Sequence, residues 1–316
     1  MNTATAMQLC LLVPALGAAG IVAAGRWPNL REAVTLVTAA ALFVCVLAVL
    51  AGLLDGDVPT VVLAEPLPGL PLALRPEPLG VLFALLASGL WIVTSVYSIG
   101  YIRAKRESHQ TRFYLCFAIA LVGAMGVALA SNLLTLFVFY EVLTLSTYPL
   151  VAHAGTPEAI RGARTYLGIL LATSIGLFLP AILWTYSVAG ALDFRPGGVL
   201  AGHLGLGLTA LLLGLFVLGI GKAAVMPVHR WLPAAMVAPT PVSALLHAVA
   251  VVKAGVFTIT KVVIYIFGLE FLAGVPAERI LVYVAGFTVV ASSIVALRQD
   301  NLKRLLAYST IGQLSY

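Results

Sequence analysis

The sequence predicts an all-α fold, a polytopic membrane helical bundle with about ten transmembrane helices. Of its 316 residues, 61% are apolar and only 9% are charged, whereas a soluble domain carries about 25% charged residues. The mean hydropathy of +1.07 agrees with this composition. The apolar residues also fall into runs of the length that a helix needs to cross a bilayer, about 20 residues. These observations exclude a water-soluble fold.

The predicted spans follow one another along the chain, with one long outer loop between the second and the third. They cover residues 5–25, 34–54, 78–101, 113–130, 133–153, 165–188, 205–226, 242–268, 280–297 and 302–316. The first span has no basic stretch before it, so we interpret it as a membrane helix and not as a cleaved signal peptide. The last span is short for a crossing and has no polar tail, so we expect a fragment of a longer protein.

The positions of the basic residues predict how the bundle sits in the membrane. Most of the 18 Lys and Arg residues lie in loops that follow odd-numbered spans. Cytoplasmic loops are enriched in Lys and Arg, so we expect the N-terminus outside a bacterial-type cytoplasmic (inner) membrane. This bias also accounts for the net charge of +6. No basic patch interleaved with aromatic residues is present, so we expect contact with the lipid bilayer and not with nucleic acid.

The sequence carries no pattern for a cofactor or a metal. Cys10, Cys45 and Cys116 lie in separate apolar runs, as packing residues do and iron–sulfur ligands do not. No GxxxxGK[ST] loop occurs, and no His or carboxylate cluster has metal-ligand spacing. Ser243 lies one turn before His247, which is a weak case for an activated serine. We therefore predict no cofactor and no metal.

Ionisable residues within spans are costly at membrane depth and are therefore functional candidates by default. Glu141 is the only acidic residue inside a predicted span. Thr144 and Tyr148 follow it at i+3 and i+7, which places a polar stripe on one face of the helix. A structural ion pair or a protonated buried acid is the alternative role for Glu141.

Lys222 lies near one end of a long apolar run, in the stretch Gly219-Ile-Gly-Lys-Ala-Ala-Val-Met-Pro227. Pro227 cannot continue helical hydrogen bonding, so the sequence predicts a broken helix near this residue. A break at membrane depth is tolerated where the backbone lines a cavity. A lysine beside such a break can be desolvated and exchange its proton near neutral pH. A lysine whose ammonium reaches the membrane interface is the alternative.

His247 and Lys253 follow in the next predicted span. An imidazole titrates near neutral pH, as a proton relay requires. Lys253 comes six residues later, about 120° round the helix, so the two side chains can line different parts of a path. For Lys261, an interfacial position and a functional one are equally consistent with the sequence. One acid, a histidine and several lysines over three spans are the exchangeable charges that a proton relay needs.

Several motifs resemble the proton-conducting antiporter-like subunits shared by respiratory complex I, membrane-bound hydrogenases and Mrp-type Na⁺/H⁺ antiporters. These motifs run from residue 113 to the end and are specific only in combination. They are Tyr140-Glu141; Gly221-Lys222-Ala-Ala with Pro227-Val-His229-Arg-Trp231-Leu-Pro233; Ala238-Pro-Thr-Pro-Val-Ser-Ala-Leu-Leu-His247; Lys253-Ala-Gly255; and Leu302-Lys303-Arg304-Leu-Leu-Ala-Tyr308-Ser309-Thr310. Ala234 departs from the pattern, because the family commonly has an acid at that position.

The resemblance implies a fourteen-helix fold with two inverted five-helix repeats, each with a broken helix and a half-channel. On that scheme the N-terminal transmembrane helices occupy residues 1–112 and the first antiporter-like repeat occupies residues 113–268. Residues 279–316 form the truncated start of the second repeat. Only the first repeat is then complete, so conduction through the whole membrane would need more than this chain.

The resemblance also implies roles for individual residues. Glu141 resembles the family's glutamate on span five, and Lys222 resembles its partner lysine on the broken helix. His247 and Lys253 resemble the relay towards the second half. Lys303 resembles a residue of the polar axis, whereas the distribution of basic residues assigns it to a loop. These residues imply a proton-translocating subunit of a multisubunit cation/proton antiporter or complex I-like complex, with other membrane subunits as partners.

Alternatives remain within the family and outside it. The chain could serve an NADH:quinone oxidoreductase, a membrane-bound hydrogenase or an inorganic-carbon uptake system, and it would be part of an enzyme only in a redox complex. The motif Thr240-Pro-Val-Ser243, followed by His247 and by Val252-Lys-Ala-Gly255, favours the Mrp-like group, in which Na⁺ exchanges for protons. The alternative from another class is a structural or inactive membrane subunit whose buried charges only hold helices together.

Overall fold

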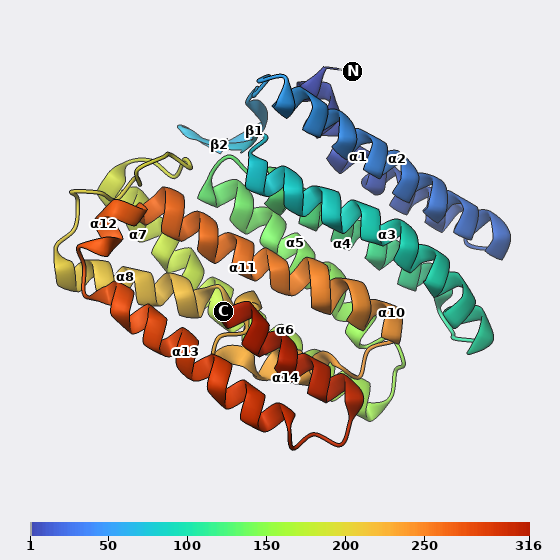
Figure 1. Ribbon diagram of the computed structural model, residues 1–316. Helices are drawn as coiled ribbons and strands as arrows, with labels where there is room; N and C mark the ends of the chain where they lie inside the picture. The colour runs from blue at the N-terminus through green and yellow to red at the C-terminus, as the bar shows by residue number, and fades with distance from the viewer. Residues whose placement is uncertain (1) are drawn as a thin grey trace. The chain divides into compact units, whose positions relative to one another are not determined.

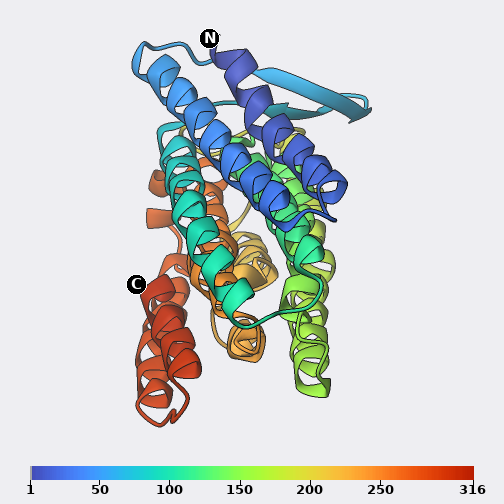
Figure 2. The ribbon, with the colours of Figure 1, turned by 90° about the vertical axis from the view of Figure 1, so that its right-hand side faces the viewer.

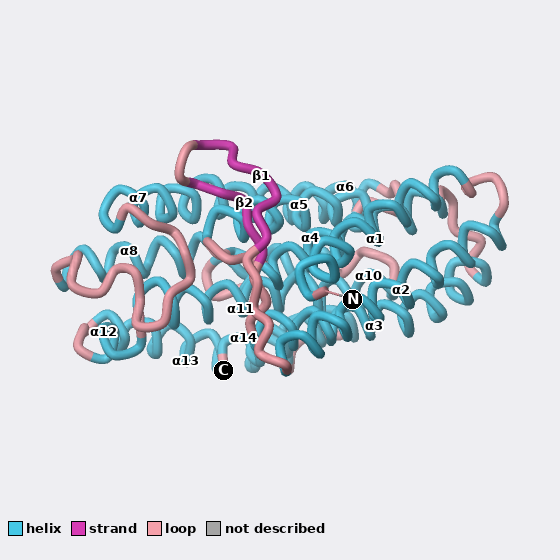
Figure 3. Tube along the Cα trace, turned by 90° about the horizontal axis from the view of Figure 1, so that it is seen from above, coloured by secondary structure: helices cyan, strands magenta, loops and turns pink. Residues whose placement is uncertain are grey.

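The computed structural model describes residues 2–316, except for the side chains of Leu67, Leu246, His247, Ala248, Val249 and Ala277. Within these residues the regular structure is helical apart from a single β-hairpin, which Figure 3 colours magenta. The chain divides into two compact units. The first unit contains Met1–Ile160 and Ala238–Ala250, and the second contains Arg161–Val237 and Val251–Tyr316. The repeat boundaries at residues 112 and 268 remain a prediction.

The first unit is built mainly on long regular helices, coloured blue to green in Figure 1. Pro28 and Pro78 stand in the first turns of α2 and α3, where the fixed φ of proline suits the helix and its missing N–H is not needed. The elements are α1 (Thr3–Ala23), α2 (Pro28–Leu54), α3 (Pro78–Ala104), α4 (Gln110–Leu129), α5 (Leu133–Val151), α10 (Thr240–Val242) and a π-helical segment (Ser243–Ala250).

Helix α4 forms the core of the first unit because it packs against α1, α3 and α5. Every residue from Gly123 to Leu129 is buried. Gly123 lies against the backbone of Leu143, and Gly126 lies against the ring of Phe139, both on α5. Small residues at a helix interface let two backbones approach closely, which is how membrane helices gain packing energy without a hydrophobic driving force.

The β-hairpin occupies a stretch that the sequence predicts as a long loop. Strand β1 (Val61–Leu67) pairs antiparallel with β2 (Leu70–Leu74), and Figure 2 shows the hairpin near the N-terminal end of α1. The α4–α5 corner fixes it, because Arg75 N donates to Leu129 O at 2.8 Å and Ser131 N donates to Ala73 O at 3.0 Å. Two prolines inside the strands hide the alternating pattern, so the hairpin depends on a contact that lies far away in the sequence.

The second unit contains shorter and interrupted helices, coloured yellow-green to red in Figure 1. Helix α6 begins at the end of the first unit and continues through a π-helical turn into α7. The elements are α6 (Pro157–Thr173), a π-helical turn (Ser174–Phe178), α7 (Leu179–Ala189), α8 (Leu206–Gly219), two 3₁₀ turns (Gly221–Ala223 and Val228–Arg230), α9 (Trp231–Ala235), α11 (Val251–Lys261), a π-helical segment (Val262–Phe267), α12 (Leu269–Ala273), α13 (Ala277–Ala296) and α14 (Leu302–Ser315).

Seven helices among the described residues are long and apolar enough to cross a membrane. They correspond to the first six predicted spans and the ninth. The other three predicted spans are shorter or interrupted: α8 and α14 have 14 residues each, and the stretch 240–268 changes from α to π geometry and back. The all-α membrane bundle is therefore confirmed, and the departures from regular helix are concentrated in residues 174–267.

Candidate functional site

The predicted broken helix is present between α8 and α9. Helix α8 ends at Gly219, and Ile220 leaves the helical conformation with ψ 59°. One 3₁₀ turn follows, and then Ala224 adopts a left-handed conformation with φ 56°. A non-glycine residue in this region costs on the order of 1 kcal/mol. The break therefore begins before Pro227, at a glycine, and the proline lies inside the interruption.

Side chains satisfy the backbone groups that the break leaves open. The indole Nε1 of Trp231 donates to Gly221 O at 2.8 Å, and the same carbonyl accepts from Ala224 N at 3.0 Å. Met226 N donates to Thr288 Oγ1, on α13, at 3.3 Å. Irregular backbone at membrane depth needs such partners, because no water is available in the lipid. Trp231 belongs to the motif Pro227–Pro233, but nothing in the sequence of that motif indicates this hydrogen bond.

Lys222 lies in the 3₁₀ turn of the break and is fully buried, with 0% of its surface exposed. Its backbone packs against Gly255 of α11, where a Cβ would collide with Lys222 and Ala223. Burial excludes the interfacial lysine that the sequence allowed. A buried lysine is costly unless its surroundings are polar or charged, so Lys222 remains a functional candidate.

The other predicted lysines of the second unit differ in exposure. Lys253, two residues before Gly255, is exposed. Lys303 is half-buried in the first turn of α14, a helix that packs against the 3₁₀ turn of Lys222 and against α9 and α11. The backbone of His247 lies in the π-helical segment of the first unit, and its side chain is outside the described residues.

Glu141 lies in the middle of α5 in the first unit. Phe139 and Leu143, two residues to either side, form the contact with α4, so Glu141 points to the opposite face of its helix. Both of its carboxylate oxygens are shielded from solvent and accept no hydrogen bond from the described residues. Thr144, which belongs to the predicted polar stripe, donates its hydroxyl to the backbone of its own helix, from Oγ1 to Tyr140 O at 3.0 Å. A buried carboxylate without such partners is a functional candidate.

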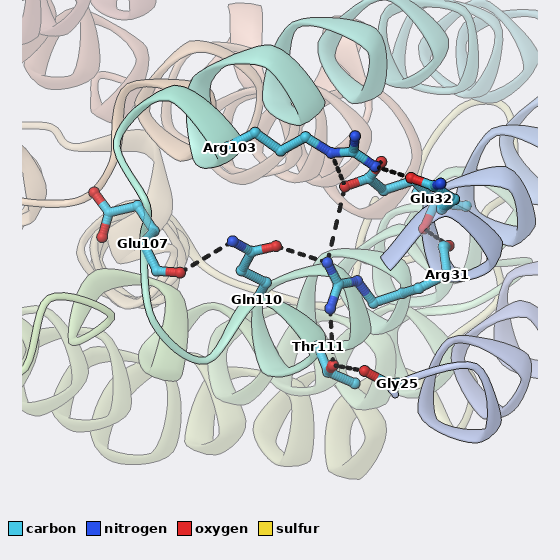
Figure 4. Close-up of polar contacts among 9 residues, drawn as sticks. Gly25, Arg31, Glu32, Arg103, Glu107, Gln110 and Thr111 are labelled. Carbon is cyan, nitrogen blue, oxygen red and sulfur yellow. Dashed lines mark hydrogen bonds and ion pairs between the residues drawn. The ribbon is translucent and has the colours of Figure 1, made fainter. Parts of the chain in front are cut away.

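A cluster of charged residues around Arg31, Glu32 and Arg103 lies in the first unit, and the sequence did not predict it (Figure 4). Glu32 is buried and accepts from Arg103 Nε at 2.9 Å. Arg31 is also buried, and its guanidinium donates to Gln110 Oε1 at 2.7 Å and Thr111 Oγ1 at 3.2 Å. Because α2 begins at Pro28, Glu32 lies within a membrane helix, and the statement that only Glu141 does so is wrong. The proline that opens α2 was the available signal.

Three or more His, Cys, Asp or Glu side chains do not come together as a metal site anywhere in the described part of the chain. Two ionisable groups shielded from solvent remain candidates for function: the carboxylate of Glu141 in the first unit and the amine of Lys222 in the second. Both are enclosed within membrane helices or the break between them.

The sequence matches known proteins over most of its length. The family model described as "NADH:quinone oxidoreductase/Mrp antiporter, TM" matches residues 130–316. A Staphylococcus aureus protein that carries the name antiporter subunit mnhA2 is 32% identical over 250 residues, 77% of this chain. NAD(P)H-quinone oxidoreductase subunit 5 of Zygnema circumcarinatum chloroplasts is 31% identical over 76% of this chain. The chain spans 30% and 34% of the length of these two relatives.

Solved structures share the fold. A chain of the Mrp complex from Dietzia sp. superposes with a TM-score of 0.82 and 27% identity, covering 99% of this chain and 33% of that one. A chain of respiratory complex I from Thermus thermophilus gives a TM-score of 0.74 and 25% identity, covering 97% of this chain and 62% of that one. A chain of an archaeal membrane-bound sulfane sulfur reductase gives a TM-score of 0.83 at 24% identity, covering 98% and 63%. This chain therefore belongs to the NADH:quinone oxidoreductase/Mrp antiporter family of multi-pass membrane subunits.

Proposed function

We propose that this chain is the proton-translocating membrane subunit of a multisubunit cation/proton antiporter or of a related respiratory complex. Its relay consists of Glu141, Lys222, His247 and Lys253, and Lys303 on α14 continues it. The observation that carries the proposal is the complete burial of Lys222 on an interrupted helix. The names of the relatives, an antiporter subunit and a quinone oxidoreductase subunit, support the two kinds of complex.

The chemistry follows from how charge is stabilised at membrane depth. Burial disfavours an ammonium group, whereas a nearby carboxylate favours it. Lys222 binds a proton while Glu141 stabilises the resulting charge, and it releases the proton towards His247 and Lys253 when that stabilisation is withdrawn. Groups that interact in this way titrate as a coupled set and not one by one. Other membrane subunits then complete the path, and Na⁺ is the exchanged ion in the antiporter form.

The test uses the complete complex in everted membrane vesicles, with the pH gradient followed by a fluorescent dye. Lys222→Met removes the charge, and Lys222→Arg keeps the charge but cannot release a proton. Both variants, and Glu141→Gln, are expected to lower transport by about 100-fold or more, the scale of a lost proton-transfer group. Lys105→Met, at an exposed position, is the matched control and should transport normally.

Native gels must show that each variant assembles to the normal level. Normal transport by an assembled Lys222→Met complex would refute the relay. A structural subunit predicts a different result, because loss of a buried charge would then reduce the amount of complex and leave the transport rate per complex unchanged.

A further inference from the structure

A second buried lysine lies at the end of α11, away from the break. The side chain of Lys261 is 1% exposed. Its Nζ lies 3.8 Å from the ring centroid of Phe194, 5.5 Å from that of Phe257 and 5.9 Å from that of Tyr265. A cation within about 6 Å of a ring centroid is attracted by the negative face of the ring. Lys261 is therefore held in a cage of three aromatic rings, and it is not an interfacial lysine.

The fold builds this aromatic cage from two segments of the second unit. Phe257 and Tyr265 lie four residues before and after Lys261, a spacing that brings side chains together on one helix face. Phe194 comes from the segment between α7 and α8, and its ring packs on Tyr265 with centroids 6.1 Å apart. Leu200 N donates to Ile266 O at 2.9 Å, which fixes the same segment over the end of α11.

Gly198 makes the close approach of this segment possible. It has φ +87°, in the left-handed region that favours glycine, and a Cβ there would collide with the backbone of Phe267 and Gly268. The segment that carries Phe194 therefore lies directly on the π-helical turn that follows Lys261. Phe194 closes the aromatic cage from outside the helix.

The surroundings of Lys261 suit a permanent charge. Ring faces attract the ammonium and gain nothing comparable from the neutral amine. A proton carrier must pass between the two forms, whereas the three rings favour the charged form over the neutral one. Fixed positive charges at constrictions are a known means of excluding protons and other cations from a path through a membrane.

We infer that Lys261 is a fixed cation that closes this end of α11 to protons, so that protons on the relay leave through Lys253 and do not leak past Phe194. This inference rests on the proposed function, because it assigns a boundary to the relay of that function. It adds a selectivity-determining residue that carries no proton itself.

The test measures two quantities on the complete complex in proteoliposomes: coupled transport, and the passive decay of an imposed pH gradient. Lys261→Met should speed the passive decay on the order of ten-fold, because the repulsion between one unit charge and a nearby proton is of that size at an effective dielectric constant near 20. Lys261→Arg keeps the charge and the contacts with the rings but cannot give up its proton. It should show the decay rate and the coupled transport of the parent complex.

Two outcomes would overturn the inference. An unchanged decay rate in Lys261→Met means that no barrier was removed, and loss of transport in Lys261→Arg means that Lys261 carries protons. If Lys261→Met does not assemble, Phe194→Leu decides, because it opens the aromatic cage and keeps the lysine: a decay several-fold faster supports the barrier and an unchanged decay refutes it.

The double variant Lys222→Met with Lys261→Met separates this inference from the proposed function. If protons reach Lys261 through the relay, the pH gradient should decay as slowly in the double variant as in the parent complex. Faster decay in the double variant would refute the link between barrier and relay. Failure of the proposed function would show as normal transport in the Lys222→Met single variant, whatever the Lys261 variants do.

Discussion

Arg31 in the first unit and Lys222 in the second are both buried cations, and the chain accommodates them in different ways. Arg31 lies in a long regular helix and is held by hydrogen bonds to Gln110 and Thr111, with Glu32 Oε1 at 3.8 Å. Its guanidinium also lies 5.3 Å from the ring centroid of Tyr114. Lys222 lies where the helix is interrupted and an indole supports the backbone.

The two cations suit different tasks under the proposed function. Arginine stays protonated in proteins, and its planar group fits several acceptors at once. The Arg31 cluster therefore fixes the ends of α2, α3 and α4 to one another. Lysine can release its proton, and under the proposed function that release is the purpose of Lys222. Arg31, a permanent charge, lies in a regular helix, and Lys222, the exchangeable cation of the proposed function, lies at a break.

Among changes to the Arg31 cluster, Glu32→Gln is expected to lower the free energy of unfolding most. The change leaves Arg31 buried without its counter-charge, which costs about 3–5 kcal/mol when one partner of a buried pair is removed. Chemical unfolding in detergent should show this loss, while Asp57→Asn, at an exposed position, should have little effect. An unaltered unfolding midpoint in Glu32→Gln would mean that the Arg31 cluster does not stabilise the contacts among α2, α3 and α4.

A smaller effect is expected from Arg31→Lys, which keeps the charge and loses the two directed hydrogen bonds to Gln110 and Thr111. The expected loss of stability is about 1–2 kcal/mol, with normal transport once the complex has assembled. Arg106→Lys, at an exposed position, provides the control. Loss of transport in a stable Arg31→Lys complex would place Arg31 in the proton path and end the distinction between the two cations.

The smallest effect concerns His153, just beyond the end of α5, which is 2% exposed and has no hydrogen bond from the described residues to either ring nitrogen. Burial, and then the charges of Arg112 and His109, lower the pKa of His153 to about 4. The unfolded chain binds this proton near pH 6.5, so its contribution to stability is complete above that pH and is lost as the pH falls towards 4.

Replacing His153 should remove that part of the pH dependence. The unfolding midpoint of the parent chain should fall between pH 7.5 and pH 4.5 by more than that of His153→Phe. The exposed His203 supplies the control, because His203→Phe should leave the pH dependence of the parent unchanged. Equal slopes for the parent and His153→Phe would show that His153 is protonated as readily in the folded state.

The sequence was sufficient for features that depend on neighbouring residues. Apolar runs predicted the long helices, Pro227 predicted an interruption, and the isolated charges Glu141 and Lys222 were recognised as buried candidates. Features that depend on distant contacts were missed. Glu32 and Arg103 lie far apart in the sequence, and the hairpin needs the α4–α5 corner. The aromatic cage was visible in part, as a ring four residues to each side of Lys261, but Phe194 gave no local signal.

The hydrogen bond between Trp231 and the Gly221 carbonyl has an optical consequence. The ring of Trp231 packs edge-on against Tyr166, with centroids 5.6 Å apart. The indole is therefore enclosed, and its N–H donates to Gly221 O at 2.8 Å. Indole emission shifts in wavelength and intensity when that N–H changes partner. With Trp27, Trp91 and Trp184 replaced by phenylalanine, the fluorescence of the remaining indole would report each rearrangement of the break in real time, with no added label.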